Sequence, residues 1–138
     1  MKIFLDANIL VSVLNKEFPL FTYSSRVVSL TNNPKFTIYT SPLCLAIAYY
    51  FVEKKHGNTL ARSKISLLIQ NLNITAITEK TIIEVEKNRK IHDFEDGLQY
   101  YSALQDGCKC IITEDRNGFY FSEIEVLTAR KFMEKYIL

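Results

Sequence analysis

The sequence predicts an α/β fold, a three-layer α/β/α sandwich whose central sheet is mostly parallel. Short apolar or β-branched segments alternate with longer segments of helical periodicity along the chain, which is typical of such folds. The 138 residues are about the size of one domain, and 48% of them are hydrophobic, which is enough for one sizeable core. Because no linker, repeat or low-complexity segment interrupts the pattern, we expect residues 1–138 to form a single domain.

The first half of the chain is expected to contain, in order, a strand at 2–5, helices at 8–16 and 19–31, a strand at 36–40, helices at 42–55 and 60–72, and a possible strand at 74–77. Ser41 and Pro42 suit the N-cap and the first position of the third helix. That helix contains the longest apolar run, residues 43–52, which is half of the roughly 20 residues needed to cross a bilayer. The run therefore predicts a buried helix.

The second half is expected to contain helices at 79–89 and 93–107, strands at 108–113 and 124–128, and a closing helix at 129–136. Asp93 is a good N-cap for its helix, and Gly107 suits the position just after the last turn. The segment 115–121 is expected to be a loop or a single turn.

The composition limits the classes of protein that fit. The net charge of +2 is too small to indicate nucleic-acid binding, which must rest on local clusters instead. Asp6 interrupts the apolar N-terminal segment and no cleavage site follows, so we expect neither a secretory signal nor a membrane partner. The three cysteines include no C-x-x-C pair and are expected to be reduced packing residues, which indicates a cytoplasmic protein.

Acidic residues stand where two of the expected strands end. Asp6 directly follows the strand at 2–5, and Asp115 lies just beyond the strand at 108–113. Ligand sites in open α/β sheets gather beyond the carboxyl ends of the strands, so these two side chains are expected to converge. Carboxylates that share a cleft repel one another unless a cation compensates them, and Mg²⁺ prefers such oxygen ligands. A metal held in this way polarises a phosphodiester and activates water, so the pattern points to phosphodiester hydrolysis.

Simpler explanations compete with a catalytic role for some of the acids. Asp93, Glu95 and Asp96 lie at the start of a helix, where capping and the helix dipole favour negative charge. Asp115 is also compatible with an ordinary turn. The order of elements alone does not place Asp96, because its helix could begin at the opposite end of the layer from the strand ends. Asp6 is harder to explain structurally, since the residues around it exclude unpaired charge.

Three blocks of the sequence carry a resemblance to a known family. The blocks are MKIFLDANILVSVL, DFEDGLQYYSAL and CIITEDRNGF, which begin at residues 1, 93 and 110. In this order they resemble the signature blocks of the PIN-domain ribonucleases, which include the VapC-type toxins of bacterial toxin–antitoxin modules. The matching residues are Asp6, Asn8, Asp96, Ala103, Thr113, Asp115 and Phe119. The segment TIYTSPLCLA, from residue 37, also resembles the family's second strand and the helix after it.

The resemblance implies a PIN-like fold and roles for the matching residues. Asp6, Asp96 and Asp115 match the family's acidic positions and are expected to bind Mg²⁺ or Mn²⁺ and to carry catalysis. In that family the helix that bears the acid matched here by Asp96 brings this acid to the cleft, so the resemblance also implies where Asp96 lies. The residues expected to support or line the site are Asn8, Ser41, Thr113 and Asp93.

Two family positions are not matched. PIN nucleases commonly carry a glutamate about one turn into the helix after the second strand, and that position falls here near Ala46 or Ile47. Glu53 lies about 9 Å further along this helix at 1.5 Å per residue, too far for a direct exchange. Gly118 stands where family members often have another aspartate. Three carboxylates remain, which leaves weak or altered catalysis open.

Two functions follow from the resemblance. The first is a metal-dependent endoribonuclease that acts as a toxin, with RNA as substrate, an antitoxin as partner and a homodimer as assembly. The second is a degenerate PIN module that binds RNA or a protein without efficient cleavage, because the usual glutamate is missing. A phosphotransfer enzyme of another α/β fold is disfavoured, because DAN at 6–8 lacks the second acid of the haloacid-dehalogenase D-x-D motif.

Few positively charged side chains in the sequence are candidates for contact with RNA. Arg116, beside Asp115, is the first candidate, whereas Lys54, Lys55 and Arg62 are expected to be solvated charges. His92, like the other histidine, lacks metal-ligand spacing, and we assign it no chemistry.

Overall fold

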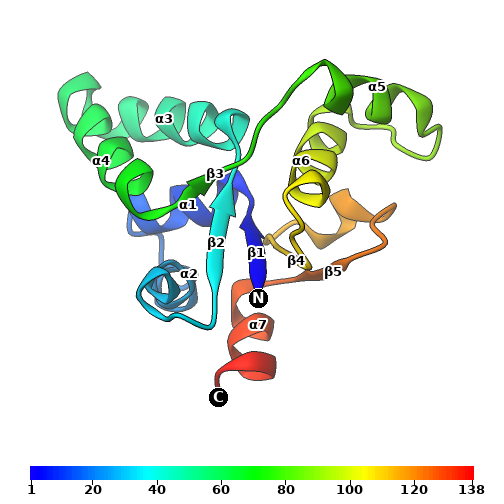
Figure 1. Ribbon diagram of the computed structural model, residues 1–138. Helices are drawn as coiled ribbons and strands as arrows, with labels where there is room; N and C mark the ends of the chain where they lie inside the picture. Colours follow the sequence, from blue (N-terminus) through cyan, green and yellow to red (C-terminus); the bar gives the residue numbers. More distant parts are fainter.

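The sheet contains five parallel strands, which confirms the predicted α/β fold (Figure 1). The computed structural model describes all residues 1–138. The strands are β1 (Lys2–Leu5), β2 (Thr37–Thr40), β3 (Asn73–Ile74), β4 (Cys110–Ile112) and β5 (Glu125–Leu127), in the spatial order β3-β2-β1-β4-β5. Because every neighbouring pair is parallel, the carboxyl ends of all five strands lie along one edge.

Helices cover the sheet on both sides. They are α1 (Ala7–Leu14), α2 (Phe21–Ser29), α3 (Pro42–His56), α4 (Asn58–Asn71), α5 (Glu79–Lys87), α6 (Phe94–Gln105) and α7 (Ala129–Tyr136), with two short 3₁₀ helices, η1 (Leu30–Asn32) and η2 (Arg116–Phe119). In Figure 1, α1 to α4 lie to the left of the sheet, α5 and α6 lie to its right, and α7 packs against α2 below. This arrangement is the expected sandwich.

The central strand β1 is the axis of the core. Ile3, Phe4 and Leu5 are fully buried, and Ile3 lies opposite Ile38 of β2 and Cys110 of β4. A parallel sheet must be covered on both faces, so its strands are apolar throughout rather than alternating. The apolar strand at 2–5 therefore places the following residue, Asp6, at the edge of a dry core.

Several element boundaries differ from the sequence-based expectation, and two of the differences have identifiable reasons. The helix expected at 19–31 ends at Ser29 and continues only as η1, because Asn33 precedes a proline and adopts extended backbone angles. The strand expected at 74–77 pairs with β2 only at Asn73–Ile74. One further hydrogen bond joins Thr75 N to Thr40 O (2.8 Å), and the Thr75 hydroxyl then donates to Ser102 of α6, which draws the chain off the sheet.

Helix α3 is only half buried, so the expectation of a buried helix over 43–52 is wrong in part. Cys44, Ala48 and Val52 repeat at four-residue spacing and face α1 and α4. Tyr50 and Phe51 are 58% and 46% exposed. The run is apolar all round, but only one of its faces has a neighbouring helix.

The cysteines are packing residues, as expected. All three thiols are free and buried, and burial raises the pKa of Cys110 to about 12. No helix has both the length and the apolar character needed to cross a membrane.

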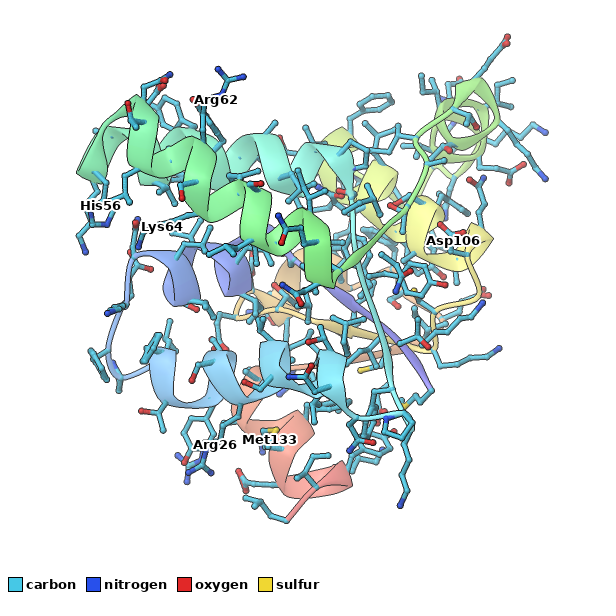
Figure 2. The ribbon with its side chains drawn as sticks, turned by 60° about the vertical axis from the view of Figure 1, so that its left-hand side comes forward. Arg26, His56, Arg62, Lys64, Asp106 and Met133 are labelled. Carbon is cyan, nitrogen blue, oxygen red and sulfur yellow. The ribbon has the colours of Figure 1, made fainter.

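Two lysines cap the carboxyl end of α1. Lys55 Nζ donates to Asn15 O (2.7 Å) and Lys64 Nζ to Leu14 O (2.6 Å). Figure 2 shows Lys64 reaching from α4 toward α1, while Arg62 points outward from the same helix. The expectation that Lys55 is merely solvated is therefore wrong, because its charge meets the negative end of the α1 dipole.

Gly97 in α6 is required by its contact with α5, which gives a first prediction. A Cβ at Gly97 would lie 2.7 Å from Val85 Cγ1, closer than real Cβ contacts. Overpacking costs about 1–3 kcal/mol, more than the gain of about 1 kcal/mol from alanine's helix propensity. Gly97→Ala should therefore lower the free energy of unfolding, measured by urea denaturation. In a Val85→Ala background the closest contact is removed and Ile91 Cγ2 remains at 3.0 Å, so the same change should be less destabilising; an equal loss in both backgrounds would contradict the account.

Candidate active site

Asp6 stands at the junction between β1 and α1. Its backbone N–H still donates to Ile112 O of β4 (3.0 Å), so the sheet ladder fixes its position. Its Oδ1 accepts from Ala7 N (2.8 Å), which makes Asp6 the N-cap of α1. One carboxylate oxygen is thus used for capping, and the residue is half-buried at the carboxyl edge of the sheet.

The buried hydroxyl of Thr113 links three predicted site residues. It donates to Asp6 Oδ2 (2.8 Å) and accepts from Asn8 Nδ2 (3.1 Å) and from the Asp115 backbone N–H (3.0 Å). The Asn8 amide is held at its other end, because its Oδ1 accepts from Glu114 N (3.2 Å). The first turn of α1 and the segment after β4 are therefore joined by a chain of side-chain hydrogen bonds.

Asp96 and Asp115 meet over Gly118. Asp115 caps η2, with its Oδ1 accepting from Gly118 N (3.2 Å). A Cβ placed on Gly118 would lie 3.0 Å from Asp96 Oδ2 and 3.0 Å from Asp115 Oδ2. The two free carboxylate oxygens thus converge on one point, and the absence of a side chain at Gly118 leaves room for them.

The position of Asp96 resolves the question that the order of elements left open. Two helices, α5 and α6, connect β3 to β4, and α6 leads directly into β4. The end of α6 lies at the amino edge of the sheet, because Lys2 Nζ at the start of β1 donates to Asp106 O (3.1 Å). The helix therefore begins toward the carboxyl edge, where Asp96 approaches Asp115. The concern that its start could lie at the opposite end of the layer is wrong.

Asp93 serves as the N-cap of α6. Its Oδ1 accepts from Asp96 N (3.1 Å), as its place before the helix predicted. Its charge nevertheless acts on the site, because Asp93 is the carboxylate that most strongly raises the pKa of Asp96.

Ser41, the N-cap of α3, links this helix to α6 by a hydrogen bond. Its Oγ accepts from Cys44 N (3.0 Å) and caps α3, and its hydroxyl donates to Gln99 Oε1. Gln99 is 1% exposed and lies three residues after Asp96, one helical turn along the same face. The sequence analysis missed Gln99; the signal was a polar residue at a core-facing position of a helix that bears an acid.

A cavity of about 400 Å³ opens beside Asp6. Its polar wall consists of Asp6, Asn8, Asp96 and two acids that the sequence analysis did not select, Glu17 and Glu95. Asp115 is not part of this wall; it reaches the site through its approach to Asp96.

The cavity wall includes one of the two residues expected near the unmatched family position. Of the two candidates, Ile47 lines the cavity and Ala46 does not. An isoleucine side chain therefore stands inside the pocket near the position of the expected glutamate.

The site concentrates negative charge. Partial burial and, in decreasing order of effect, the carboxylates of Asp93, Asp6, Asp115 and Glu95 together raise the pKa of Asp96 to about 7. Burial also raises the pKa of Asp6, against the lowering effect of its hydrogen bond from Thr113. The three ion pairs of the structure lie elsewhere, so no lysine or arginine neutralises these acids.

The donor set suits a hard divalent cation that keeps part of its water shell. The free oxygens of Asp96 and Asp115 converge, and no protein cation competes for them. The acids do not form a group of three close enough to enclose an ion directly. Mg²⁺ characteristically binds through one or two carboxylates and retains several waters, which fits this spacing.

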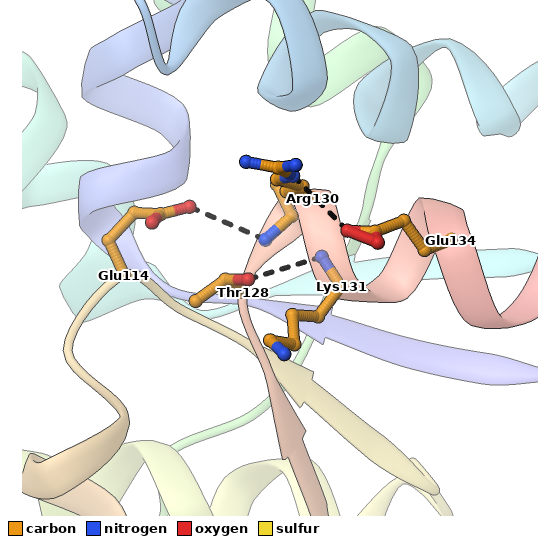
Figure 3. A network of polar contacts seen from close by, with 6 residues as sticks. Glu114, Thr128, Arg130, Lys131 and Glu134 are labelled. Atoms are coloured by element: carbon orange, nitrogen blue, oxygen red, sulfur yellow. Dashed lines mark hydrogen bonds and ion pairs between the residues drawn. The ribbon is translucent and has the colours of Figure 1, made fainter.

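Glu114 and Arg116 flank Asp115 but point to different places. Glu114 Oε1 accepts from Ala129 N (3.3 Å), beside Thr128, which caps α7 through Lys131 N (Figure 3). Glu114 therefore belongs to the start of α7 and not to the acidic cleft. Arg116 is exposed at the first position of η2, without an ion-pair partner.

Comparisons with known proteins show the family of this chain. The family model of the PIN domain matches residues 2–117. The chain belongs to the PIN domain family. It is 33% identical over 139 residues to Ribonuclease VapC1 of Aquifex aeolicus (strain VF5), and the match covers 98% of this chain and 95% of that PIN protein.

Solved structures share the PIN fold of this chain. VapBC2 from Rickettsia felis, bound to a promoter DNA fragment, is 23% identical with a TM-score of 0.70, covering 92% of this chain and 97% of that one. VapBC-1 from nontypeable Haemophilus influenzae is 17% identical with a TM-score of 0.68, covering 94% and 99%. VapC20 of Mycobacterium tuberculosis, a Sarcin-Ricin loop cleaving toxin, is 12% identical with a TM-score of 0.63, covering 79% and 86%. At these identities the likeness concerns the fold.

Removal of the Thr113 hydroxyl should damage both stability and the site. Thr113→Val leaves Asp6 Oδ2 and the Asn8 amide without their shared partner, and an unsatisfied buried polar group costs about 1–3 kcal/mol. Loss of such an orienting contact typically lowers metal affinity by about 10–100-fold. Urea denaturation and Mn²⁺ titration measure the two effects. Thr113→Ser keeps the hydroxyl and should retain both; a Val variant that matches wild type in both would contradict the account.

The raised pKa of Asp96 predicts a pH-dependent stability. Because folding raises this pKa from 3.8 to about 7, the folded protein binds a proton that the unfolded chain releases. That contribution is complete below pH 3.8 and is lost as the pH rises to about 7. Asp96→Asn cannot ionise, so without divalent metal it should melt at a higher temperature than wild type at alkaline pH, with the difference shrinking in acid. A lower melting temperature for Asp96→Asn at alkaline pH would contradict this.

Proposed function

We propose that this protein is a metal-dependent endoribonuclease that acts as the toxin of a toxin–antitoxin module. The observation that carries the proposal is the convergence of Asp6, Asp96 and Asp115, which come from three distant segments, at one edge of the sheet without a neutralising cation. The identity to Ribonuclease VapC1 over nearly the whole chain supports the same activity.

In this proposal the three aspartates hold Mg²⁺ or Mn²⁺ directly or through waters that the ion retains, because they do not lie close enough to enclose it directly. Both oxygens of Asp6 accept hydrogen bonds, from Ala7 N and from Thr113, so Asp6 keeps a fixed position beside the ion. Asp96 and Asp115 present their free oxygens side by side. When bound, the ion polarises the scissile phosphodiester and lowers the pKa of water for in-line attack.

The other predicted residues support these three. Thr113 and Asn8 fix the distance between Asp6 and the turn of Asp115, and Ser41 with Gln99 fixes α6 against α3. Arg116 is placed to meet an RNA phosphate, because it is exposed next to Asp115. Without the ion, the cleft would repel the phosphates that it must admit, so activity requires the divalent cation.

The proposed setting is cytoplasmic, with a protein partner. Free buried thiols fit a reducing compartment. The likeness in fold to the VapBC structures supports an antitoxin as the partner and an assembly larger than one chain. We propose a homodimer that an antitoxin restrains.

A second function is favoured by one specific observation. Ile47 lines the cavity near the position where the family's glutamate is expected, and it supplies no oxygen to a metal. The alternative is a degenerate PIN module that binds RNA or a protein without efficient cleavage. Metal affinity separates the two functions, because the nuclease needs a divalent site and the binding module does not.

The nuclease proposal predicts Mn²⁺-dependent cleavage of RNA that each aspartate controls. Wild-type protein should cut single-stranded RNA with Mn²⁺ and not with EDTA. Asp96→Asn should lose at least about a hundredfold of this activity, because an amide neither replaces the charge nor binds the ion as a carboxylate does. Asp106→Asn, a half-buried acid at the far end of α6, is the matched control and should cut like wild type. Equal cleavage by wild type and Asp96→Asn would indicate a contaminating nuclease and contradict the proposal.

Calorimetric titration with Mn²⁺ separates the nuclease from the binding module. The nuclease proposal expects a saturable site that Asp6→Asn abolishes, whatever the activity of the preparation. RNA binding by a protein that takes up no Mn²⁺ at millimolar concentration would favour the degenerate module. Ile47→Glu supplies a carboxylate to the cavity wall and should strengthen Mn²⁺ binding.

A further inference from the structure

We propose that Phe94, His92, Tyr120 and Arg89 form a subsite, hereafter the stacking surface, which binds an unpaired RNA base beside the scissile phosphodiester. The inference rests on the proposed function and adds a substrate-binding element to it. The rings carry the recognition, because single-stranded RNA is characteristically held by stacking its bases on Phe, Tyr or His side chains and on Arg guanidinium planes.

The stacking surface adjoins the acidic cleft across one turn of helix. A cavity of about 360 Å³ is lined by Arg89, His92 and Phe94, together with residues of α5. The next two residues, Glu95 and Asp96, line the cavity that contains Asp6. The first turn of α6 thus lies between the two cavities, and in this proposal the RNA strand passes over that turn from one to the other.

The aromatic rings of this surface lie mostly outside the core. Phe94 is 53% exposed and Tyr120 is 55% exposed, although both are large apolar side chains. The His92 ring stacks on Tyr120, with centroids 5.8 Å apart and planes at 24°. Flat rings kept in water next to a cavity are costly for a folded protein and favourable for a base.

Hydrogen bonds hold these rings in a fixed relation to the acids. The Tyr120 hydroxyl accepts from His92 N (3.1 Å) and donates to Lys90 O, so it ties the loop before α6 to the segment after η2. Asn88 anchors the same loop to Tyr101 of α6 through its Nδ2 (3.1 Å). Asp115 begins η2, and Tyr120 directly follows its last residue. The rings are therefore preorganised with respect to the proposed cleavage site.

The charge of the surrounding loop favours RNA as the occupant. Lys87, Arg89 and Lys90 lie within four residues, opposite in sign to the acidic cleft. Arg89 has one ion-pair partner, Glu86, at 3.6 Å, and both side chains are exposed (88% and 66%), so the pair is weak and easily exchanged for a phosphate. Aromatic rings flanked by positive charges suit single-stranded RNA, because the rings stack on its bases and the charges attract its phosphates.

The absence of tryptophan from the chain allows a direct optical test. Phe94→Trp and, as the matched control, Tyr50→Trp on α3 each introduce a single fluorophore at an exposed aromatic position; Tyr50 is 58% exposed and lines neither cavity. Both are made in an Asp96→Asn background so that RNA is not consumed. Single-stranded RNA should quench the fluorescence of Phe94→Trp saturably in Mg²⁺, which offsets the charge of the acidic cleft, and duplex RNA of the same sequence should quench it less. The fluorescence of Tyr50→Trp should not respond to either RNA.

Binding and turnover of Phe94 variants give the second readout. One base stack is worth about 1–3 kcal/mol, so Phe94→Ala should weaken single-stranded RNA binding by about tenfold or more and raise KM with little change in kcat. Phe94→Leu should behave like alanine and Phe94→Tyr like wild type, because only the latter keeps a ring. Circular dichroism checks that each variant is folded.

The outcomes separate this inference from the proposed nuclease function. If wild type cuts RNA and Phe94→Ala binds and cuts it equally well, the stacking surface is wrong and the nuclease stands. If RNA quenches the Phe94→Trp variant but wild type cuts nothing with Mn²⁺, the subsite stands and the nuclease fails. Equal quenching of the Phe94→Trp and Tyr50→Trp variants, or quenching of Phe94→Trp by a protein partner but not by RNA, overturns the subsite.

Discussion

The hydroxyl of Thr113 is the contact on which the geometry of the site depends. It is fully buried, and it joins Asp6 at the end of β1 to Asn8 in α1 and to the backbone of Asp115 after β4. β1 and β4 are adjacent parallel strands, so their ends are already neighbours. The hydroxyl converts that proximity into a fixed distance between two carboxylates, which an exposed loop contact could not do.

Charge concentration is the second constraint, and it supports the proposed binding of a divalent cation. Burial and four neighbouring carboxylates hold the pKa of Asp96 near 7, so the free protein bears an unfavourable arrangement that a divalent cation relieves. The repulsion among these carboxylates lowers the stability of the free protein, as is common for groups that serve an active site. Ile47 makes the cavity wall partly apolar, so in the proposed function the ion is held by the aspartates and by the waters that it retains.

Much of this architecture was predictable because it follows from local patterns. The apolar strand at 2–5, the caps Ser41 and Asp93 and the closing helix at 129–136 all depend on neighbouring residues, and the structure has them. Asp6 was selected because an acid after a buried strand is unusual, and the fold puts it at the carboxyl edge.

What could not be predicted depends on contacts between distant segments. The partial exposure of α3 depends on which helices pack against it. The role of Gln99 can be recognised only from the hydrogen bond that it accepts from Ser41, a residue far away in the sequence. Glu17 and His92 look like surface residues in the sequence; the cavities that they line exist only after folding. The place of Asp96 follows from all-parallel topology, which alternation of elements suggests but does not specify.

Anomalous diffraction from crystals grown with Mn²⁺ tests the central claim most directly, because it locates the ion without reference to activity. The account predicts one ordered Mn²⁺ at the carboxyl edge of the sheet, bound directly or through water to Asp6, Asp96 and Asp115, and its disappearance in Asp96→Asn crystals. An ordered ion elsewhere on the surface, with none between these aspartates at millimolar Mn²⁺, would contradict it.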